Sequence, residues 1–205
     1  DGGRVARGSW VGTPPAPKEY VADDATSAAA VTRAAGSVPS AVTCLATSPY
    51  HPKAFLAGHG TGTVCLHSTS AAAAVLLWPE LGAGGVTGLA WSPTRPACFF
   101  VLDAACTLHH FDLTKSLSGP VASEAFMAAA AGGVASLTTK LAAAGLQPRG
   151  KATEVVPCFA LGYDDGGVDV HALSASHAAC GSVEGEVMKL VEVLGVPAAS
   201  AAPST

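Results

Sequence analysis

Residues 86–113 read VTGLAWSPTRPACFFVLDAACTLHHFDL, and this stretch decides the fold because the chain carries a related copy 44 residues earlier. The two copies open with VTCLA and VTGLA, and both continue into a Ser-Pro pair, Ser48-Pro49 in the first and Ser92-Pro93 in the second. Nine of the 26 aligned positions in residues 42–67 and 86–111 are identical. The chain is therefore built from repeated units.

The length of the repeat indicates its fold. A period of about 40–45 residues filled with short strands is typical of the blades of a WD-repeat β-propeller. A unit of this kind cannot bury its own hydrophobic face and must stack on its neighbours. We expect four strands in each copy, which are Val42–Thr47, Ala54–His59, Thr63–Ser68 and Ala74–Trp78, then Val86–Ser92, Cys98–Asp103, Thr107–Leu113 and Val121–Phe126.

A third, stretched copy follows in residues 159–173, where Gly162 and Gly166 correspond to Gly58 and Gly62. Their offset of 104 exceeds twice the repeat by 16 residues, so we expect an inserted Ala/Gly-rich loop near residues 140–154. Asp164-Asp165-Gly166 is a strong hairpin-turn signal.

A short helix is expected near the C-terminus. Val187, Leu190, Val191 and Leu194 fall on one helical face, and Ser182 is a suitable N-cap. A lone helix of this length is not stable in water, so this face must dock, either on the propeller or on another subunit.

The predicted fold is therefore all-β, comprising about three C-terminal blades of a propeller and a short C-terminal helix. The chain starts without Met and within a unit, which suggests a piece of a longer polypeptide. The expected segments are the end of a preceding blade (1–12), a linker (13–40), two blades (41–79 and 80–126), a last blade with the inserted loop (127–176), and the helix with a disordered tail (177–205).

The composition excludes several classes of function. The net charge is −4, with 11 Lys and Arg scattered along the chain, which argues against a nucleic-acid-binding stripe. No apolar run reaches the roughly 18–20 residues of a membrane span, so no membrane insertion is expected. Six cysteines without a CxxC pair are expected to be reduced thiols of an intracellular protein.

Three groups of residues suggest a chemical site, but each also fits a simpler structural role. His109 and His110, with His67 and His171, could suggest a metal site, but His67 and His171 hold equivalent repeat positions. Asp164 and Asp165 could be a hydrolytic acid pair, but adjacent strand residues point to opposite faces. The glycines at 58, 60 and 62 are followed by a strand and not by the helix that a dinucleotide-binding loop requires. We therefore expect no catalytic residue, metal or cofactor.

The quoted stretch resembles a blade near the end of the WD-repeat propeller of dynein intermediate chains. That family has Trp-Ser-Pro, then Arg or His, then Pro, an apolar strand and an aromatic-Asp-Leu close, and the matching residues here are Trp91, Ser92, Pro93, Arg95, Pro96, Phe111, Asp112 and Leu113. Residues 2–9 are similar to the family's upstream Gly-x-Val-x-Arg-Gly-Ser segment, and residues 159–173 to its last blade. Residues 117–123 and the short helix look most like the branch found in the retrograde intraflagellar-transport dynein.

The resemblance implies a non-catalytic scaffold of a dynein complex, located in the cytoplasm and cilium, whose propeller docks on the heavy-chain tail. The implied partners are the dynein heavy chain, other dynein subunits and transport-train proteins. Alternatives are an axonemal or cytoplasmic dynein intermediate chain, a peptide-binding WD-repeat adaptor, and a propeller hydrolase. One departure is that the third-strand Trp-Asp of a typical WD repeat is replaced, so its usual Asp-His-Ser-Trp network is not expected here.

Overall fold

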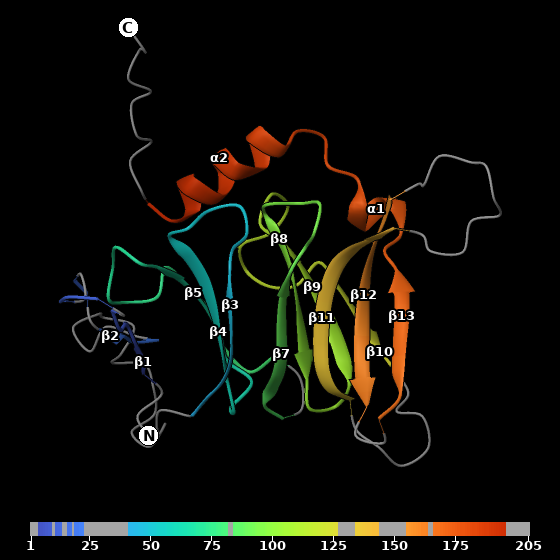
Figure 1. Cartoon of the computed structure of the whole chain (residues 1–205), viewed down its shortest axis with the longest axis horizontal. Helices are drawn as coiled ribbons and strands as arrows, with labels where there is room; N and C mark the ends of the chain where they lie inside the picture. The colour runs from blue at the N-terminus through green and yellow to red at the C-terminus, as the bar shows by residue number, and fades with distance from the viewer. Residues whose placement is uncertain are drawn as a thin grey trace, which may run out of the picture.

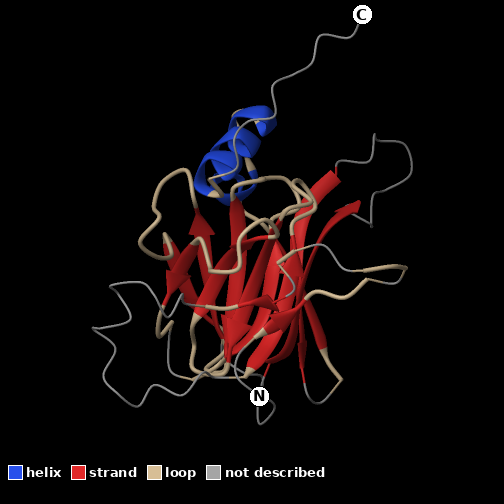
Figure 2. Ribbon diagram, turned by 90° about the vertical axis from the view of Figure 1, so that its left-hand side faces the viewer, coloured by secondary structure: helices blue, strands red, loops and turns tan. Residues whose placement is uncertain are grey.

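The computed structural model describes residues 4–9, 11–13, 16–17, 19–22, 41–81, 84–126, 134–143, 155–163 and 166–195, of which 134–143 and 155–156 are described by their backbone alone. Four antiparallel sheets make up this part of the chain. Three of them stand side by side like the blades of a fan, with both helices at one end of the strands (Figures 1 and 2).

The first and second sheets are four-stranded meanders in which each strand pairs with the next along the chain. The first sheet contains β3 (Val42–Thr47), β4 (Ala54–His59), β5 (Val64–Ser68) and β6 (Leu76–Trp78). The second contains β7 (Val86–Trp91), β8 (Cys98–Asp103), β9 (Thr107–Asp112) and β10 (Ala122–Ala125). Both sheets follow the 44-residue repeat.

The third sheet has three described strands, β11 (Val134–Ala143), β12 (Val155–Tyr163) and β13 (Val168–Ala172). A two-stranded sheet of β1 (Val5–Ala6) and β2 (Glu19–Tyr20) lies beside the first sheet. Tyr20 of β2 packs edge-on against Phe55 at 5.0 Å between ring centroids. The predicted all-β class, a partial propeller with a C-terminal helix, is thus confirmed.

The inserted segment of the third sheet differs from the expected loop at its start. Residues 140–143 continue β11, where Lys140 pairs with Cys158 and Ala143 with Val155. Backbone pairing with β12 extends this hairpin, and a composition rich in alanine gave no sign of it. Residues 144–154, the Asp164-Asp165 turn, most of the 13–40 linker and the tail 198–205 lie outside the described residues.

One turn recurs in all three sheets. A residue one or two positions before the third strand has a positive φ each time, 84° at Gly62, 62° at Cys106 and 86° at Gly166. Glycine adopts this conformation without steric penalty, which explains two of the three positions. At Gly62 an added Cβ would also meet the carbonyl oxygen of Gly84 at 2.8 Å.

A stacked ring pair recurs at the same position in each sheet. The pairs Phe55–His67, Phe99–Phe111 and Phe159–His171 have centroid distances of 4.8, 4.7 and 5.0 Å and interplanar angles of 9°, 7° and 15°. Each pair joins the second and third strands of its sheet. His67 and His171 therefore fill the place that Phe111 occupies in the second sheet, as the repeat predicts.

The helices close one end of the fan. The short α1 (Ala175–Ala178) follows β13, and α2 (Val183–Val193) then crosses above the strand ends (Figure 1). The Ser182 side chain accepts a hydrogen bond from the Gly185 amide at 3.0 Å, as expected of an N-cap. No helix in the described ranges is both long and apolar enough to span a membrane.

The structure shows where the predicted helix face lies. Leu190 and Leu194 are 0% and 5% exposed and belong to the core shared by the first and second sheets. Val187 and Val191 lie half-buried beside them. The face therefore docks on this chain's own blades, and Leu190 and Leu194 are not available to another subunit in this structure.

Candidate functional site

The loop between β7 and β8 takes its shape from its Ser-Pro pair. The Ser92 hydroxyl accepts hydrogen bonds from the amides of Thr94 at 3.4 Å and Arg95 at 3.2 Å. In the first sheet Ser48 accepts from Tyr50 and His51, both at 3.3 Å. The repeated Ser-Pro motif thus forms the same side-chain-stabilised turn in both blades.

This turn positions Arg95 at the centre of a buried charge network. Its Nε donates to Oε1 of Glu186 at 2.7 Å, its Nη2 lies 2.6 Å from the same oxygen, and its Nη1 donates to Oδ2 of Asp112 at 2.8 Å. Arg95, Asp112 and Glu186 are 5%, 0% and 7% exposed. The β7–β8 loop, the end of β9 and helix α2 are therefore joined by one guanidinium.

The remaining oxygens of the two carboxylates are also satisfied. Oε2 of Glu186 accepts from the Ala97 amide at 3.2 Å, and Oδ1 of Asp112 accepts from the Thr114 amide at 3.0 Å. Lys115 approaches Asp112 at 3.3 Å. A buried ion pair tolerates its loss of hydration only when such additional bonds complete it.

The environment keeps these groups charged. Burial opposes the ionised form of Asp112, but the hydrogen bonds from Thr114 and Arg95 outweigh it and hold its pKa well below the usual range. Burial likewise opposes the charge on Arg95, yet the bonds to Glu186 and Asp112 raise its pKa further. Asp112 and Arg95 are thus both ionised at any physiological pH.

Two further hydrogen bonds tie the β7–β8 region to its surroundings, one to α1 and one to the first sheet. The Thr94 hydroxyl donates to the carbonyl of Ala178, at the end of α1, at 2.9 Å. The Trp91 indole, 4% exposed, donates to the carbonyl of Ala46 in the first sheet at 3.1 Å. We call residues 91–97 with Asp112 and Glu186 the helix clamp.

The predicted motif positions divide between this clamp and the repeats. Trp91, Ser92 and Asp112 meet in the clamp, and Pro93 and Pro96 lie in its loop, whereas Phe111 belongs to a core ring stack. Ser48 and Pro49 form the equivalent turn of the first sheet, and Gly162 and Gly166 lie in the third.

The sequence prediction missed the role of Glu186, although its spacing from Leu190 and Leu194 could have revealed it. The three residues lie four residues apart on one helical line, so an acid falls on the buried side of the helix. Arg95 stands where the first copy has His51.

A hydrogen-bonded Asp-His-Ser chain braces the second sheet. The ring of His109 lies 2.8 Å from the Ser123 hydroxyl through Nδ1 and 3.3 Å from Asp103 Oδ2 through Nε2. Asp103 Oδ1 accepts from the amides of Ala105 and Thr107. The typical WD network was not expected. The hydrogen-bonded set of Asp103, His109 and Ser123 differs from it, because its histidine and serine come from the neighbouring strands β9 and β10.

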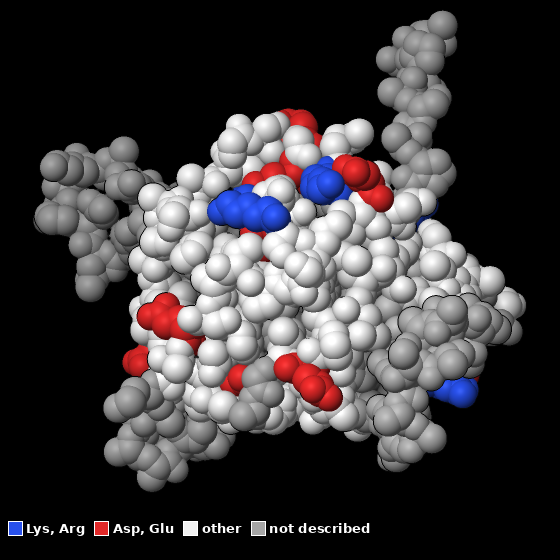
Figure 3. All heavy atoms as spheres, turned by 180° about the vertical axis from the view of Figure 1, so that it is seen from behind, with Lys and Arg blue, Asp and Glu red and all other residues white. Residues whose placement is uncertain are grey.

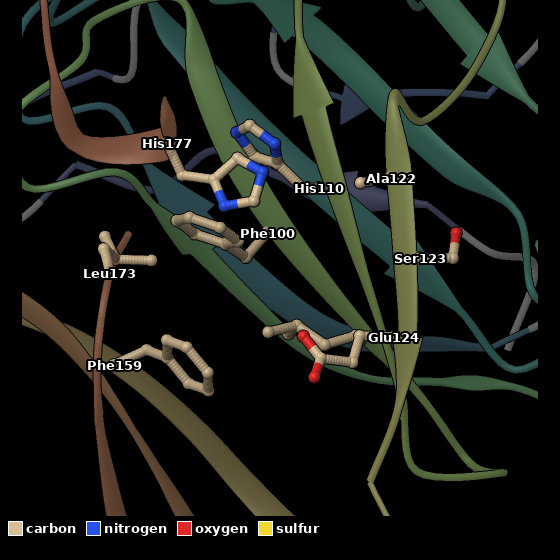
Figure 4. Close-up of a pocket in the computed structure, with 9 residues that line it drawn as sticks. Phe100, His110, Ala122, Ser123, Glu124, Phe159, Leu173 and His177 are labelled. Atoms are coloured by element: carbon tan, nitrogen blue, oxygen red, sulfur yellow. The ribbon is translucent and has the colours of Figure 1, made fainter. Parts of the chain in front are cut away.

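A pocket of about 250 Å³ lies between the second sheet, the third sheet and α1 (Figure 4). Its walls include Phe100, His110, Glu124, Phe159, Leu173 and His177. Ser123 also lines the pocket, although its hydroxyl lies on the other side of β10 from His110 and His177 (Figure 4). Among the described residues no group of three or more His, Cys, Asp and Glu could hold a metal ion.

The surface carries few charges. The face seen in Figure 3 is mostly free of Lys, Arg, Asp and Glu, and its Lys and Arg side chains lie near the end that carries the helices and lower down at one side. A small number of charges on a broad neutral surface is typical of a surface that contacts other proteins.

Comparison with known proteins adds a relationship to this geometry. No protein-family model matches the chain. Over 90 residues it is 41% identical to cytoplasmic dynein 2 intermediate chain 1 of Homo sapiens, and over 90 residues 38% identical to the protein of the same name from Mus musculus. Each match covers 43% of this chain, but only 8% of the human and 9% of the mouse protein.

Proposed function

We propose that this chain is a dynein intermediate chain domain of the dynein 2 branch and a non-catalytic scaffold of a dynein motor complex that acts in retrograde intraflagellar transport. The observation that carries the proposal is the 41% identity over 90 residues to cytoplasmic dynein 2 intermediate chain 1. The proposed partners are the dynein heavy chain, other dynein subunits and transport-train proteins, in the cytoplasm and cilium.

The physical basis of the scaffold is a rigid set of stacked blades with a broad, weakly charged surface. Propeller blades offer loops and rims as docking surfaces and need no chemistry at the site. The buried clamp holds α2 in one orientation, so its outer side is presented as a fixed surface. That side carries Met188 and Val183, which are 57% and 45% exposed.

We propose that the heavy-chain tail contacts the outer side of α2, with Met188 at its centre and Val187 and Val191 at its margin. This position revises the expected docking face, because Leu190 and Leu194 already pack on the blades. Exposed Met is a favourable anchor since its flexible thioether adapts to a partner surface.

The test is an affinity purification of the full-length protein from ciliated cells, with the recovered heavy chain identified by mass spectrometry. We expect the dynein 2 heavy chain. Recovery of an axonemal or cytoplasmic dynein 1 heavy chain instead would favour the alternative branches. Recovery of none would refute the proposed function.

A matched pair of variants tests the proposed surface. Met188→Glu places a charge on the outer side of α2, and Val121→Glu places one on the second sheet at a residue 37% exposed. We expect the first to reduce heavy-chain recovery and the second to leave it unchanged. Equal recovery from both variants would exclude α2 as the contact while leaving the scaffold function intact.

A further inference from the structure

A tryptophan fills the junction between the first and second sheets. Trp78 of β6 is 3% exposed, and its ring packs against Phe99 and Phe111 of the second sheet, with centroid distances of 5.6 and 5.0 Å. Its indole Nε1 donates to the carbonyl of Leu117, in the loop after β9, at 2.9 Å. An indole thus occupies the space between these two sheets and is hydrogen-bonded within it.

The corresponding position at the next junction holds a glutamate. Trp78 lies opposite Val64 in the first sheet, and Glu124 lies opposite Leu108 in the second. Val64 and Leu108 are 44 residues apart and therefore hold the same place in the repeat. The strand β10 reads Ala-Ser-Glu-Ala, so it supplies no ring to the space between the second and third sheets.

The space that an indole fills at the first junction is a pocket at the second. The pocket measures about 250 Å³, and Glu124 lies on its wall (Figure 4). Phe159, which takes the repeat position of Phe99, forms another part of the wall. The pocket lies between two adjacent sheets and not at an end of the fan. Sites for drug-sized ligands measure about 300–1,000 Å³, so this one suits a single small ring system.

One polar side chain of this pocket is unsatisfied. His110 is 4% exposed, and both of its ring nitrogens are buried without a hydrogen-bond partner among the described residues. The first sheet has the apolar Leu66 at the same repeat position. Burial, followed by the repulsion of His177, lowers the pKa of His110 to about 4, so its neutral ring offers one donor and one acceptor. A ligand that bonds to this ring relieves the cost of burying it unpaired.

We propose that this pocket binds an indole group, which takes the place of Trp78 at the junction of the second and third sheets. The indole packs on Phe100 and Phe159, and its N–H donates to a ring nitrogen of His110. The exposed carboxylate of Glu124 favours a positive charge on the ligand beside the ring. Two sources carry this chemistry, a free indolylalkylamine and a tryptophan next to a basic residue in a polypeptide. The inference does not depend on the proposed motor function.

The first probe is tryptamine, and its control is 1-methyltryptamine, in which a methyl group replaces the indole hydrogen. Titration of the whole chain is followed by amide chemical shifts in NMR. We expect tryptamine to bind saturably with a Kd below about 1 mM, and the methylated ligand to bind about tenfold more weakly because it cannot donate to His110. No saturable binding of tryptamine, or equal binding of the two ligands, would overturn the proposal.

A matched pair of variants places a tryptophan on either face of β10. Glu124→Trp restores the residue of the first junction and should fill the pocket. Ala125→Trp puts the same side chain on the opposite face, because successive strand residues alternate. We expect tryptamine to bind at least about tenfold more weakly to the first variant and equally well to the second. Undiminished binding to a folded Glu124→Trp chain, as judged by circular dichroism, would rule out this pocket.

The variant His110→Leu tests the hydrogen bond separately and copies Leu66 of the first sheet. Because the wall stays apolar, we expect 1-methyltryptamine to bind as it does to the unchanged chain. Tryptamine should lose its roughly tenfold advantage over the methylated ligand. If that advantage remained, His110 would not be the acceptor and the proposed recognition would be wrong.

A peptide identifies the source of the indole. The second probe is Gly-Trp-Lys-Gly blocked at both ends, and its control carries Leu in place of Trp. Binding of the Trp peptide at least as tight as that of tryptamine would support a polypeptide ligand, and binding of tryptamine alone would support a free amine. Equal binding of the Trp and Leu peptides would exclude recognition of the indole in a polypeptide.

Discussion

Replacing Arg95 by Met should release helix α2 from the blades while leaving the sheets folded. Met keeps much of the length and apolar stem of the side chain but removes the guanidinium that joins Glu186 and Asp112. Two buried carboxylates would then face each other without the guanidinium between them, and Lys115, whose side chain is 58% exposed, would remain beside Asp112 alone. Arg95 makes three contacts with them, at 2.6, 2.7 and 2.8 Å.

The magnitude follows from the burial of the network. Charge-assisted bonds are worth about 1.5–3 kcal/mol each before desolvation is counted, and loss of one partner from a buried pair costs about 3–5 kcal/mol. Burial of Leu190 and Leu194 contributes roughly 1.5–3 kcal/mol each to docking, before the entropy of ordering the helix is subtracted. Loss of the clamp therefore removes most of the net docking energy, and an 11-residue helix does not persist alone.

The assay is amide hydrogen exchange on the whole chain, read separately for α2 and for β8. We expect exchange within α2 to accelerate by a factor of roughly 100 to 1,000, since each 1.4 kcal/mol is tenfold. Exchange in β8 should change far less. The matched control is Lys189→Met, which breaks an exposed pair with Glu192 at 3.2 Å and should cost at most about 1 kcal/mol.

A rescue variant completes the experiment. Combining Arg95→Met with Asp112→Leu and Glu186→Met replaces the whole network by apolar side chains, and such replacements recover much of the lost stability. If the single Arg95→Met variant kept α2 as protected as in the unchanged chain, the helix would be held by its apolar face alone, and the reasoning about the clamp would be wrong.

Three further predictions concern acid, a histidine and a turn. Because the pKa of Asp112 is lowered in the folded state, this group contributes stability that is complete above its unfolded pKa of about 3.9. That stability is lost as the pH falls toward the lower folded value. Asp112→Asn should therefore flatten the fall of unfolding free energy at acid pH, as measured by urea denaturation at a series of pH values. His67 has its pKa lowered by burial to about 4, so stability should fall by on the order of 3 kcal/mol between pH 6.5 and 4. His67→Phe copies the Phe99–Phe111 stack and should abolish that fall. It should also stabilise the chain at pH 7 by about 1 kcal/mol, because it removes the unpartnered Nδ1. No gain in the urea midpoint would contradict this account. Gly62→Ala should lower the thermal midpoint, because the free energy of unfolding falls by more than about 1 kcal/mol. Gly119→Ala is the control, since an added Cβ there meets nothing within 4 Å. Similar midpoints for the two variants would argue against the close approach of residue 62 to Gly84.

The repeat and the helical pattern predicted the elements whose structure depends on nearby residues. The turns at Gly62 and Gly166 and the Ser182 cap are set within a few residues of sequence. The clamp is different because Arg95 and Glu186 are 91 residues apart and neither residue's neighbours specify the other. The extension of β11 to Ala143 also escaped prediction, since its sequence has no alternation and only its pairing with β12 makes it a strand.

The placement of α2 has a consequence for how the blades unfold. In a stack of repeats each unit contacts its neighbours only, so the units can open independently from either end. Leu190 and Leu194 pack into a core built from both the first and the second sheet, and Glu186 is tied to the second through Arg95. Opening either blade therefore exposes the helix, and with it the apolar surface of the other. The helix makes two adjacent blades one cooperative unit, so an applied pull reaches both blades together and is resisted by their combined stability.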